Sequence, residues 1–469
     1  MDLGLWQSMK KAAYAFFMKP VFLLTYLLFC ASVSAIQVDP VNGHDANDGV
    51  SAPVKTIARG VKLAQPGDTV HLTQATYHES VVLAAKRGLP GKPVTVDGHG
   101  SVIEGSEPVQ AVDWESLGDG LFRKVKLMPH MDPAILGRWF FLWNGRMNHM
   151  GRTSKGPSLP LKKVADLLPD EWTYVQEEDA FYVKLPAGQG LDAANLRYPL
   201  RSSGVALSGN GAHLVVRNLT CTHVYNDGFN IHGDQVDTVF ENIAAIDCGD
   251  DGFSAHEAAE CRVDGFVSMG NSTGLCDTVS SVTHFENVFI SGCLGYDIFF
   301  IGDSPHSMEN VLVESSAAYP LSVAQHVDRP QKGLSRVTLK NVLIRRAPGK
   351  AGDVKITRNS LLVAENCTFE GLNMTVTPGG EMNLTKSVVK GRGAKPDVLI
   401  FDEAVWKGSG NRYDLKSLRK GPDFFTEKSF AAFQNKVSSE ADSKWTEGAA
   451  AEPGIGADET GLERLRAPK

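Results

Sequence analysis

Short runs of alternating apolar and polar residues recur through the chain from about residue 200 onward. Residues 214–216, 238–240, 282–285 and 337–339 are four of these runs, and Gly, Asn or Asp bounds each of them. A period of two over four or five residues, ended by turn-forming residues, predicts β-strands. The connections between the runs are too short for the crossover helix that a βαβ sheet requires. The pattern therefore predicts an all-β architecture.

An asparagine followed by an apolar residue accompanies these strands at a nearly constant interval. It occurs at 218, 242, 287, 310, 341 and 366, and Asp264-Gly265 fills the one gap. A fixed period of about 23 residues is typical of a solenoid, here a parallel β-helix whose coils lie about 4.8 Å apart. We expect each asparagine to form a left-handed corner, and its amide to bond the asparagine of the next coil.

Both ends of a solenoid need caps, because the outermost strands expose unpaired edges. Residues 53–65 carry apolar residues at helical spacing and predict a capping helix, and strands are expected at 69–72 and 93–98. Residues 110–198 break the period and are rich in aromatics, with a hairpin expected between 172–174 and 180–183. The expected segments are a signal peptide (1–35), a cap with the first coils (36–109), an inserted aromatic-rich β subdomain (110–198), the main β-helix (199–420) and a C-terminal capping tail (421–469).

The first residues predict export. Lys10, Lys11 and Lys19 precede an apolar stretch from 21 to 33, and Val33-Ser34-Ala35 is a small-residue cleavage site. The stretch is shorter than the roughly 20 apolar residues that span a membrane. We expect a secreted or periplasmic protein, cleaved after Ala35, that does not associate stably with membranes.

The net charge and the cysteine content limit the classes of partner and of cross-link that the sequence suggests. The formal net charge of −7 argues against nucleic acid as a partner. Six of the seven cysteines follow the predicted cleavage site, at 221, 248, 261, 276, 293 and 367, and their spacing fits no metal or disulfide module. We expect them to be free thiols buried in the solenoid of a monomer.

The densest polar constellation lies on consecutive coils between Asn226 and Asp297. Asn226-Asp227-Gly228 is followed one coil later by Gly249-Asp250-Asp251-Gly252. Alignment on the glycines directs one set of side chains inward and two sets outward. Inward are Phe229, Phe253, Leu275 and Tyr296, with Ile298 sharing the parity of Tyr296; outward are Asn230, Ser254 and Cys276, and also His232, His256 and Thr278.

This constellation suits the cleavage of a polysaccharide. Glycoside hydrolysis uses two carboxyl groups, and crowding raises the pKa of one of them so that it becomes a general acid. The candidate catalytic residues are Asp227, Asp250, Asp251 and His256, and the candidate substrate-binding residues are Asn230, His232, Glu257, Asp277 and Trp143. A structural interpretation stands beside this one, because Asp-Gly corners form turns, histidines stack, and aromatic clusters form cores.

At these residues the chain resembles the pectin lyase-like superfamily of right-handed β-helices. Residues 38–43, 48–49 and 66–70 resemble the opening of secreted bacterial members. Asn226-Asp227 and Asp250-Asp251 are similar to the Asn-x-Asp and double Asp of polygalacturonase-like hydrolases, a resemblance that implies acid and water-activating roles for the three aspartates. The pattern departs from that family where Asn226 and Asp227 are adjacent, and where Ser272-Thr273-Gly274 replaces Gly-His-Gly. The family's Arg-x-Lys is matched only loosely, by residues 355–358.

Two other functions remain open. A polysaccharide lyase acting on a uronate needs a base and a cation, which could be Ca²⁺ on the acidic strip or Lys355 or Arg358. Within the four coils Arg262 is the only Lys or Arg, which favours hydrolysis, a reaction that requires no cofactor or metal. A non-catalytic carbohydrate-binding or surface protein is the third class.

Overall fold

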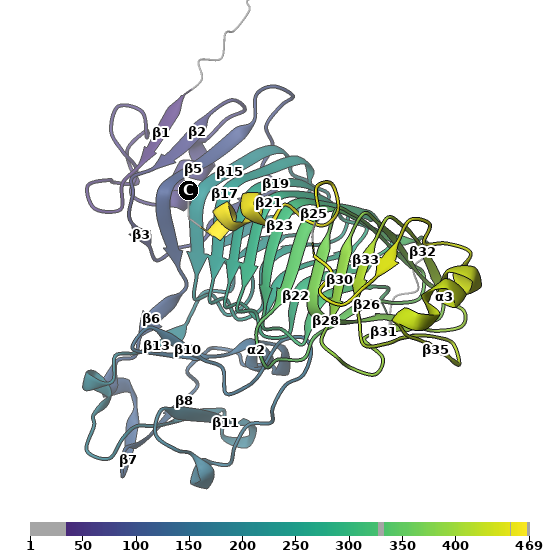
Figure 1. Ribbon diagram of the computed structural model, residues 1–469. Helices are drawn as coiled ribbons and strands as arrows, with labels where there is room; N and C mark the ends of the chain where they lie inside the picture. Colours follow the sequence, from purple (N-terminus) through teal and green to yellow (C-terminus); the bar gives the residue numbers. More distant parts are fainter. Residues whose placement is uncertain (1–33, 327–332, 451, 467–469) are drawn as a thin grey trace, which may run out of the picture. The chain divides into compact units, whose positions relative to one another are not determined.

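The computed structural model describes residues 34–326, 333–450 and 452–466, and its strands wind into stacked parallel coils (Figure 1). Each central coil adds one long strand to a first sheet, sheet A, and one short strand to a second, sheet B. The predicted right-handed parallel β-helix is confirmed. The long strands are β5 (Val94–Glu104), β15 (Ala212–Thr222), β17 (Val236–Ile246), β19 (Glu260–Met269), β21 (Val282–Ser291), β23 (Pro305–Ser315) and β25 (Ser335–Arg346). The short strands are β4 (Val81–Ala84), β14 (Val205–Ser208), β16 (Phe229–Ile231), β18 (Asp251–Ala255), β20 (Thr273–Val279), β22 (Tyr296–Gly302), β24 (Tyr319–Ala324) and β26 (Asp353–Ile356).

From β15 onward, each long strand bends at the repeated asparagine or at the glycine that replaces it. Asn218, Asn242 and Asn287 have φ of 54°, 50° and 58°, and Gly265 takes the corner between the last two with φ of 77°. Asn242 Nδ2 donates to Asn218 Oδ1 at 2.9 Å, and Asn287 Nδ2 donates to Asp264 Oδ1 at 2.7 Å. The predicted asparagine ladder is therefore confirmed, and it fixes a corner that most residues adopt only with strain.

The ladder predicts how substitutions at Asn287 affect stability. Asn287→Ala is expected to lower the free energy of unfolding by about 1–2 kcal/mol, since alanine tolerates the left-handed corner poorly. Asn287→Gly is expected to lose less, because Gly265 already occupies this corner one coil away. Urea unfolding of the two variants checks this prediction. Equal losses of unfolding free energy would mean that asparagine does not stabilise the fold through the geometry of this corner.

Aromatic and aliphatic side chains fill the interior in register from coil to coil. Phe229 pairs with Phe253, Phe253 with Leu275, and Leu275 with Ile298. The Phe253 ring centroid lies 5.2 Å from that of Phe240 across the interior, in an edge-on contact. The inward stack therefore continues through Ile298, and the prediction that Tyr296 takes this position is wrong, because Tyr296 pairs with Thr273.

A short helix closes the N-terminal end of the interior. The capping helix predicted from residues 53–65 is present as α1 (Ile57–Leu63), and Thr56 Oγ1 accepts a hydrogen bond from Arg59 N at 3.1 Å. It packs beside β1 (Ala35–Val38) and β2 (Thr69–Leu72). A Cβ at Gly60 would lie 2.7 Å from Val38 Cγ2, so glycine permits this close approach. The strand β3 (Thr76–Tyr77) follows.

The C-terminal coils are built from shorter strands and end in a helix. Phe430 of α3 (Phe430–Val437) packs against Tyr413 and Trp445, and Phe433 is buried beside Phe425. The chain then returns along the asparagine ladder, where Asn366 Nδ2 donates to Gly454 O and Asp458 N donates to Asn341 Oδ1, both at 2.7 Å. The elements are β27 (Ser360–Glu365), β28 (Thr368–Val376), β29 (Gly380–Thr385), β30 (Val388–Gly391), β31 (Val398–Ile400), β32 (Val405–Ser409), β33 (Arg412–Asp414), β34 (Leu418–Lys420), β35 (Asp423–Phe425), β36 (Lys444–Trp445) and α4 (Glu459–Leu462).

The stretch between β5 and β14 forms the insert, with two small antiparallel sheets. The predicted hairpin is present, with β11 (Glu171–Val175) paired to β12 (Ala180–Lys184). Trp139, Phe141, Trp172 and Phe181 are buried together as the core of the insert. The other elements are β6 (Ser106–Pro108), β7 (Glu115–Gly118), β8 (Leu121–Val125), α2 (Pro133–Arg138), β9 (Phe141–Trp143), β10 (Arg146–Asn148) and β13 (Leu196–Pro199).

The sequence predicts that the cysteines are buried free thiols and that the N-terminus is a signal peptide. Cys221, Cys248, Cys261, Cys276, Cys293 and Cys367 are all buried and free, as predicted. Residues 1–33 of the predicted signal peptide lie outside the described residues, so export stays a prediction. Within the described ranges, no helix has the length and apolar character needed to cross a membrane.

Candidate active site

The two aspartate-containing corners lie directly above one another. Asp250 N donates to Asn226 O at 3.0 Å, and Asp251 N donates to Asp227 Oδ1 at 3.1 Å. The glycine after each aspartate allows the coils to approach, since a Cβ at Gly228 would lie 2.8 Å from Gly252 O. One oxygen of each of the three carboxyl groups lies within 4.8 Å of the others. All three aspartates are buried, so the Asp-Gly corners gather acids as well as turning the chain.

Two cations from the insert reach these acids. Arg138, at the end of α2, places Nε 2.9 Å from Asp250 Oδ2. Lys155 places Nζ 2.5 Å from Asp250 Oδ1 and 2.7 Å from Asp251 Oδ1. Arg262 is the only Lys or Arg within the sequence of the four coils, but these two cations come from outside them. The insert supplies the cations across 95 or more residues of sequence.

Two glycines of the solenoid allow the backbone of the insert to approach closely. A Cβ at Gly249 would lie 2.4 Å from Arg138 O, and one at Gly295 would lie 2.1 Å from Lys155 O. Ser154 N also donates to Ser272 Oγ at 2.9 Å, and Ser154 Oγ donates to Asp250 Oδ1. In the sequence, Gly249 and Gly295 are compatible with a close contact, but they do not reveal which segment makes it.

The shared environment moves the pKa values of the three carboxyl groups in different directions. Burial and the nearby Asp250 raise the pKa of Asp227 to about 7. Burial and Asp250 also raise the pKa of Asp251 well above its usual value. The pKa of Asp250 is lowered instead, because Lys155 and Arg138 outweigh its burial. One ionised carboxylate therefore lies beside two that hold protons more tightly.

Two histidines form the neighbouring wall of the cavity. The rings of His232 and His256 stack with centroids 4.1 Å apart, as the coil alignment predicts. His256 Nε2 lies 2.8 Å from Ser254 Oγ, and burial lowers the pKa of His256 to about 4. His256 is therefore a neutral imidazole near pH 7. The cavity of about 470 Å³ is lined by Arg138, Lys155, Asn226, Asp227, His232, Asp250, Asp251, His256, Cys276, Thr278, Phe299, Ile301 and His326.

Two predicted substrate-binding residues lie where no substrate reaches them. Asp277 is fully buried in the solenoid, where it accepts hydrogen bonds from Ala255 N at 3.0 Å and Thr283 Oγ1 at 2.6 Å. The alternation along β20 directs it inward, opposite to Cys276 and Thr278. Trp143 is 7% exposed and packs edge-on against Phe141 in the insert core. Both predictions are wrong.

The remaining predicted residues lie beside the cavity and do not line it. Asn230 Nδ2 donates to Ser203 Oγ at 3.3 Å, and Glu257 Oε2 lies 3.0 Å from His232 Nδ1 and accepts from Gly233 N. Lys355 lies over the Tyr319 ring, 5.9 Å from its centroid, and neither Lys355 nor Arg358 lines the cavity. The cations at the acids are those of the insert.

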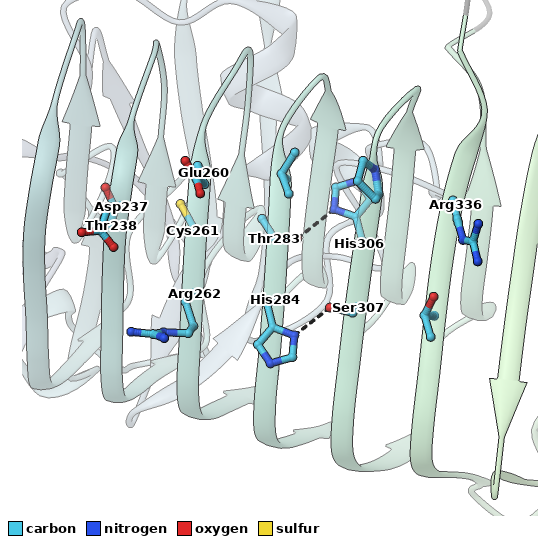
Figure 2. Close-up of a pocket in the computed structure, with 13 residues that line it drawn as sticks. Asp237, Thr238, Glu260, Cys261, Arg262, Thr283, His284, His306, Ser307 and Arg336 are labelled. Atoms are coloured by element: carbon cyan, nitrogen blue, oxygen red, sulfur yellow. Dashed lines mark hydrogen bonds between the residues drawn. The ribbon is translucent and has the colours of Figure 1, made fainter.

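A second cavity, of about 360 Å³, lies along sheet A (Figure 2). Glu260, Arg262 and His284 are among the residues that line it, and His284 Nδ1 lies 2.7 Å from Ser307 Oγ. Its charges are of both signs, and it contains none of the predicted site residues. The cavity with the three aspartates is therefore the candidate active site.

Comparisons with known proteins address the fold. No protein-family model matches the chain, and no curated protein matches it in sequence. A solved structure described as "The complex structure of XylC with xylose" is 10% identical with a TM-score of 0.52, covering 89% of this chain and 86% of that chain. Another, described as "Glycoside hydrolase", is 10% identical with a TM-score of 0.52, covering 92% of this chain and 100% of that chain. Together with the coil topology, these similarities identify the fold as a parallel β-helix.

Proposed function

We propose that the protein is a carbohydrate-active enzyme that hydrolyses a polysaccharide at the cavity lined by Asp227, Asp250 and Asp251. One observation carries this proposal: adjacent carboxyl groups whose environments shift their pKa values in opposite directions. Such a pair provides a proton donor and an ionised carboxylate at the same pH, which glycoside hydrolysis requires.

The residues take complementary roles. Asp227 holds a proton up to about pH 7 and donates it to the glycosidic oxygen. Asp250 remains ionised beside Lys155 and Arg138, and acts on a water molecule or on the anomeric carbon. Asp251 shares their hydrogen-bonded network through Lys155. Neutral His256, with His232 stacked on it, is placed to bind substrate hydroxyl groups.

Two of the similar solved structures agree with this class of substrate. One is described as a complex with xylose and the other as a glycoside hydrolase. At 10% identity, these structures support only the inference that the ligand is a carbohydrate. The roles of individual residues rest on the geometry described above.

The decisive experiment is a screen of the purified chain against acidic and neutral polysaccharides. New reducing ends without ultraviolet absorbance would support hydrolysis, whereas absorbance from a new double bond would identify a lyase. Release of no product, together with saturable binding, would place the protein in the non-catalytic class and reject the proposal.

A uronate lyase is the second candidate, because Lys155 and Arg138 lie at the acids. These cations could neutralise a substrate carboxylate during removal of the adjacent proton. The three aspartates also offer oxygen ligands of the kind that Ca²⁺ binds. Lys155 Nζ already contacts two of those carboxylates, so Ca²⁺ would bind there only if Lys155 moved. A chelator that abolishes turnover would favour this candidate, whereas hydrolysis requires no metal.

The pH dependence of Lys155→Met tests the electrostatic role of the insert. Loss of the ammonium group is expected to raise the pKa of Asp250, since Lys155 is the main group that lowers it. The acidic limb of the kcat/KM profile should therefore move to higher pH, by about 1 unit or more. Lys162→Met removes a lysine that pairs with Glu171 on the insert surface, and this control should leave the profile unchanged.

Secretion and the monomeric state remain proposals of their own. N-terminal sequencing of the exported protein would test cleavage after Ala35, and light scattering would test the monomer.

A further inference from the structure

Two histidines and an aspartate meet on the first coils, in the part of the solenoid that α1 caps. His71 on β2 is the register partner of Asp97 on β5. His99 follows Asp97 by two residues, in a bend with φ of 49°. The ring nitrogens His71 Nδ1 and His99 Nε2 lie 2.9 Å apart, and His99 Nδ1 lies 3.7 Å from Asp97 Oδ1. The three side chains therefore come from two coils and form one cluster.

Their donor atoms lie close enough together to hold one cation. One ligand atom from each residue lies within 4.8 Å of the others. Two imidazoles with one carboxylate select zinc and similar transition ions, because Ca²⁺ prefers oxygen ligands.

Neighbouring side chains hold the carboxylate in place. Asp97 is 3% exposed, and its Oδ2 accepts a hydrogen bond from Arg217 Nε at 2.8 Å. Its Oδ1, the oxygen nearer His99, accepts from Asn218 Nδ2 at 2.9 Å. Such supporting contacts are typical of metal sites, where they orient the ligands before the ion arrives.

We propose that His71, His99 and Asp97 form a zinc-class transition-metal site that ties the coil of β2 to the coil of β5. A water molecule would complete four-coordinate geometry. The site would stabilise the N-terminal end of a solenoid in which all six described cysteines are free, so that no disulfide fastens these coils. This inference does not depend on the proposed function.

Titration of the metal-free full chain with Zn²⁺, followed by calorimetry, tests the site. One saturable Zn²⁺ site is expected, together with a Zn²⁺-dependent rise in Tm. His71→Gln and His99→Asn should each weaken binding by at least about tenfold and abolish the rise in Tm. Asparagine suits position 99 because it tolerates positive φ. His130→Gln, at a histidine whose side chain is 82% exposed, is the matched control and should bind Zn²⁺ like the parent chain.

The acidic cavity is the competing location for a metal. An Asp227→Asn, Asp250→Asn double variant is expected to keep the Zn²⁺ site. Loss of binding in that double variant with retention in the histidine variants would overturn the proposal. Absence of saturable Zn²⁺ binding to the parent chain, or binding that both histidine variants retain, would also overturn it.

Discussion

Replacement of Asp250 by asparagine is expected to lower kcat for polysaccharide cleavage by about 10³-fold. Asp250 is the one carboxylate of the three whose pKa is lowered, and asparagine cannot supply its negative charge. Both cations of the insert contact it, so the variant also leaves Lys155 and Arg138 with less compensating charge. Initial rates on the substrate identified by the screen provide the measurement, with circular dichroism to confirm folding.

Controls separate this role from a general loss of structure. Asp234→Asn changes an exposed carboxyl near the same coils and should retain the parent rate. Asp227→Asn should lose most activity on polysaccharide but recover on an aryl glycoside whose leaving group needs no proton, since Asp227 is the assigned acid. Asp250→Asn should not recover on that substrate. A variant at Asp250 with the parent kcat would reject the site assignment.

The free energy of unfolding is expected to fall as pH rises from about 4 to about 7. Burial raises the pKa of both Asp277 and Asp297 from 3.8 to about 7. In this window the folded state binds more protons than the unfolded state, so stability is complete below the unfolded pKa and is lost as pH rises through the folded pKa. A shift of this size corresponds to about 4 kcal/mol for each group.

Asp277→Asn isolates one of these contributions. The difference in unfolding free energy between pH 4 and pH 8 should shrink by about 4 kcal/mol in the variant, because the buried side chain no longer ionises. The comparison uses the change with pH, so a constant loss of packing or of the bond with Thr283 does not enter. Asp234→Asn serves again as the exposed control. An unchanged pH dependence in Asp277→Asn would show that Asp277 does not carry this effect.

The periodic part of the structure is predictable from the sequence. The spacing of the asparagines predicts the coil length, and alignment of successive coils predicts that His232 and His256 lie one above the other, as they do. Strand alternation also predicts the inward Phe229 and Phe253. These predictions succeed because each coil repeats the local conformation of the previous one, so a position in one repeat specifies a position in space.

Predictions for single residues are wrong in two situations. In one, the strand is locally irregular; in the other, the chemical type of the residue is given more weight than its place in the strand alternation. Tyr296 stands at the start of β22 and not in the inward register, which Ile298 occupies. The prediction that Asp277 binds substrate conflicts with the strand alternation, because outward-facing Cys276 and Thr278 on either side imply that Asp277 faces inward. Its environment of Ala255 N and Thr283 Oγ1 comes from different strands and is visible only in the folded chain.

The repeat pattern is sufficient to predict the solenoid, its asparagine ladder and the coils on which the acids gather. The contacts of Arg138 and Lys155 with those acids, and the packing of the insert's aromatic residues into a core of their own, are visible only in the folded chain. The physical reason is the range of the contacts. Repeated coils are related by one short period, whereas Lys155 meets Asp250 across 95 residues that carry no periodic relation.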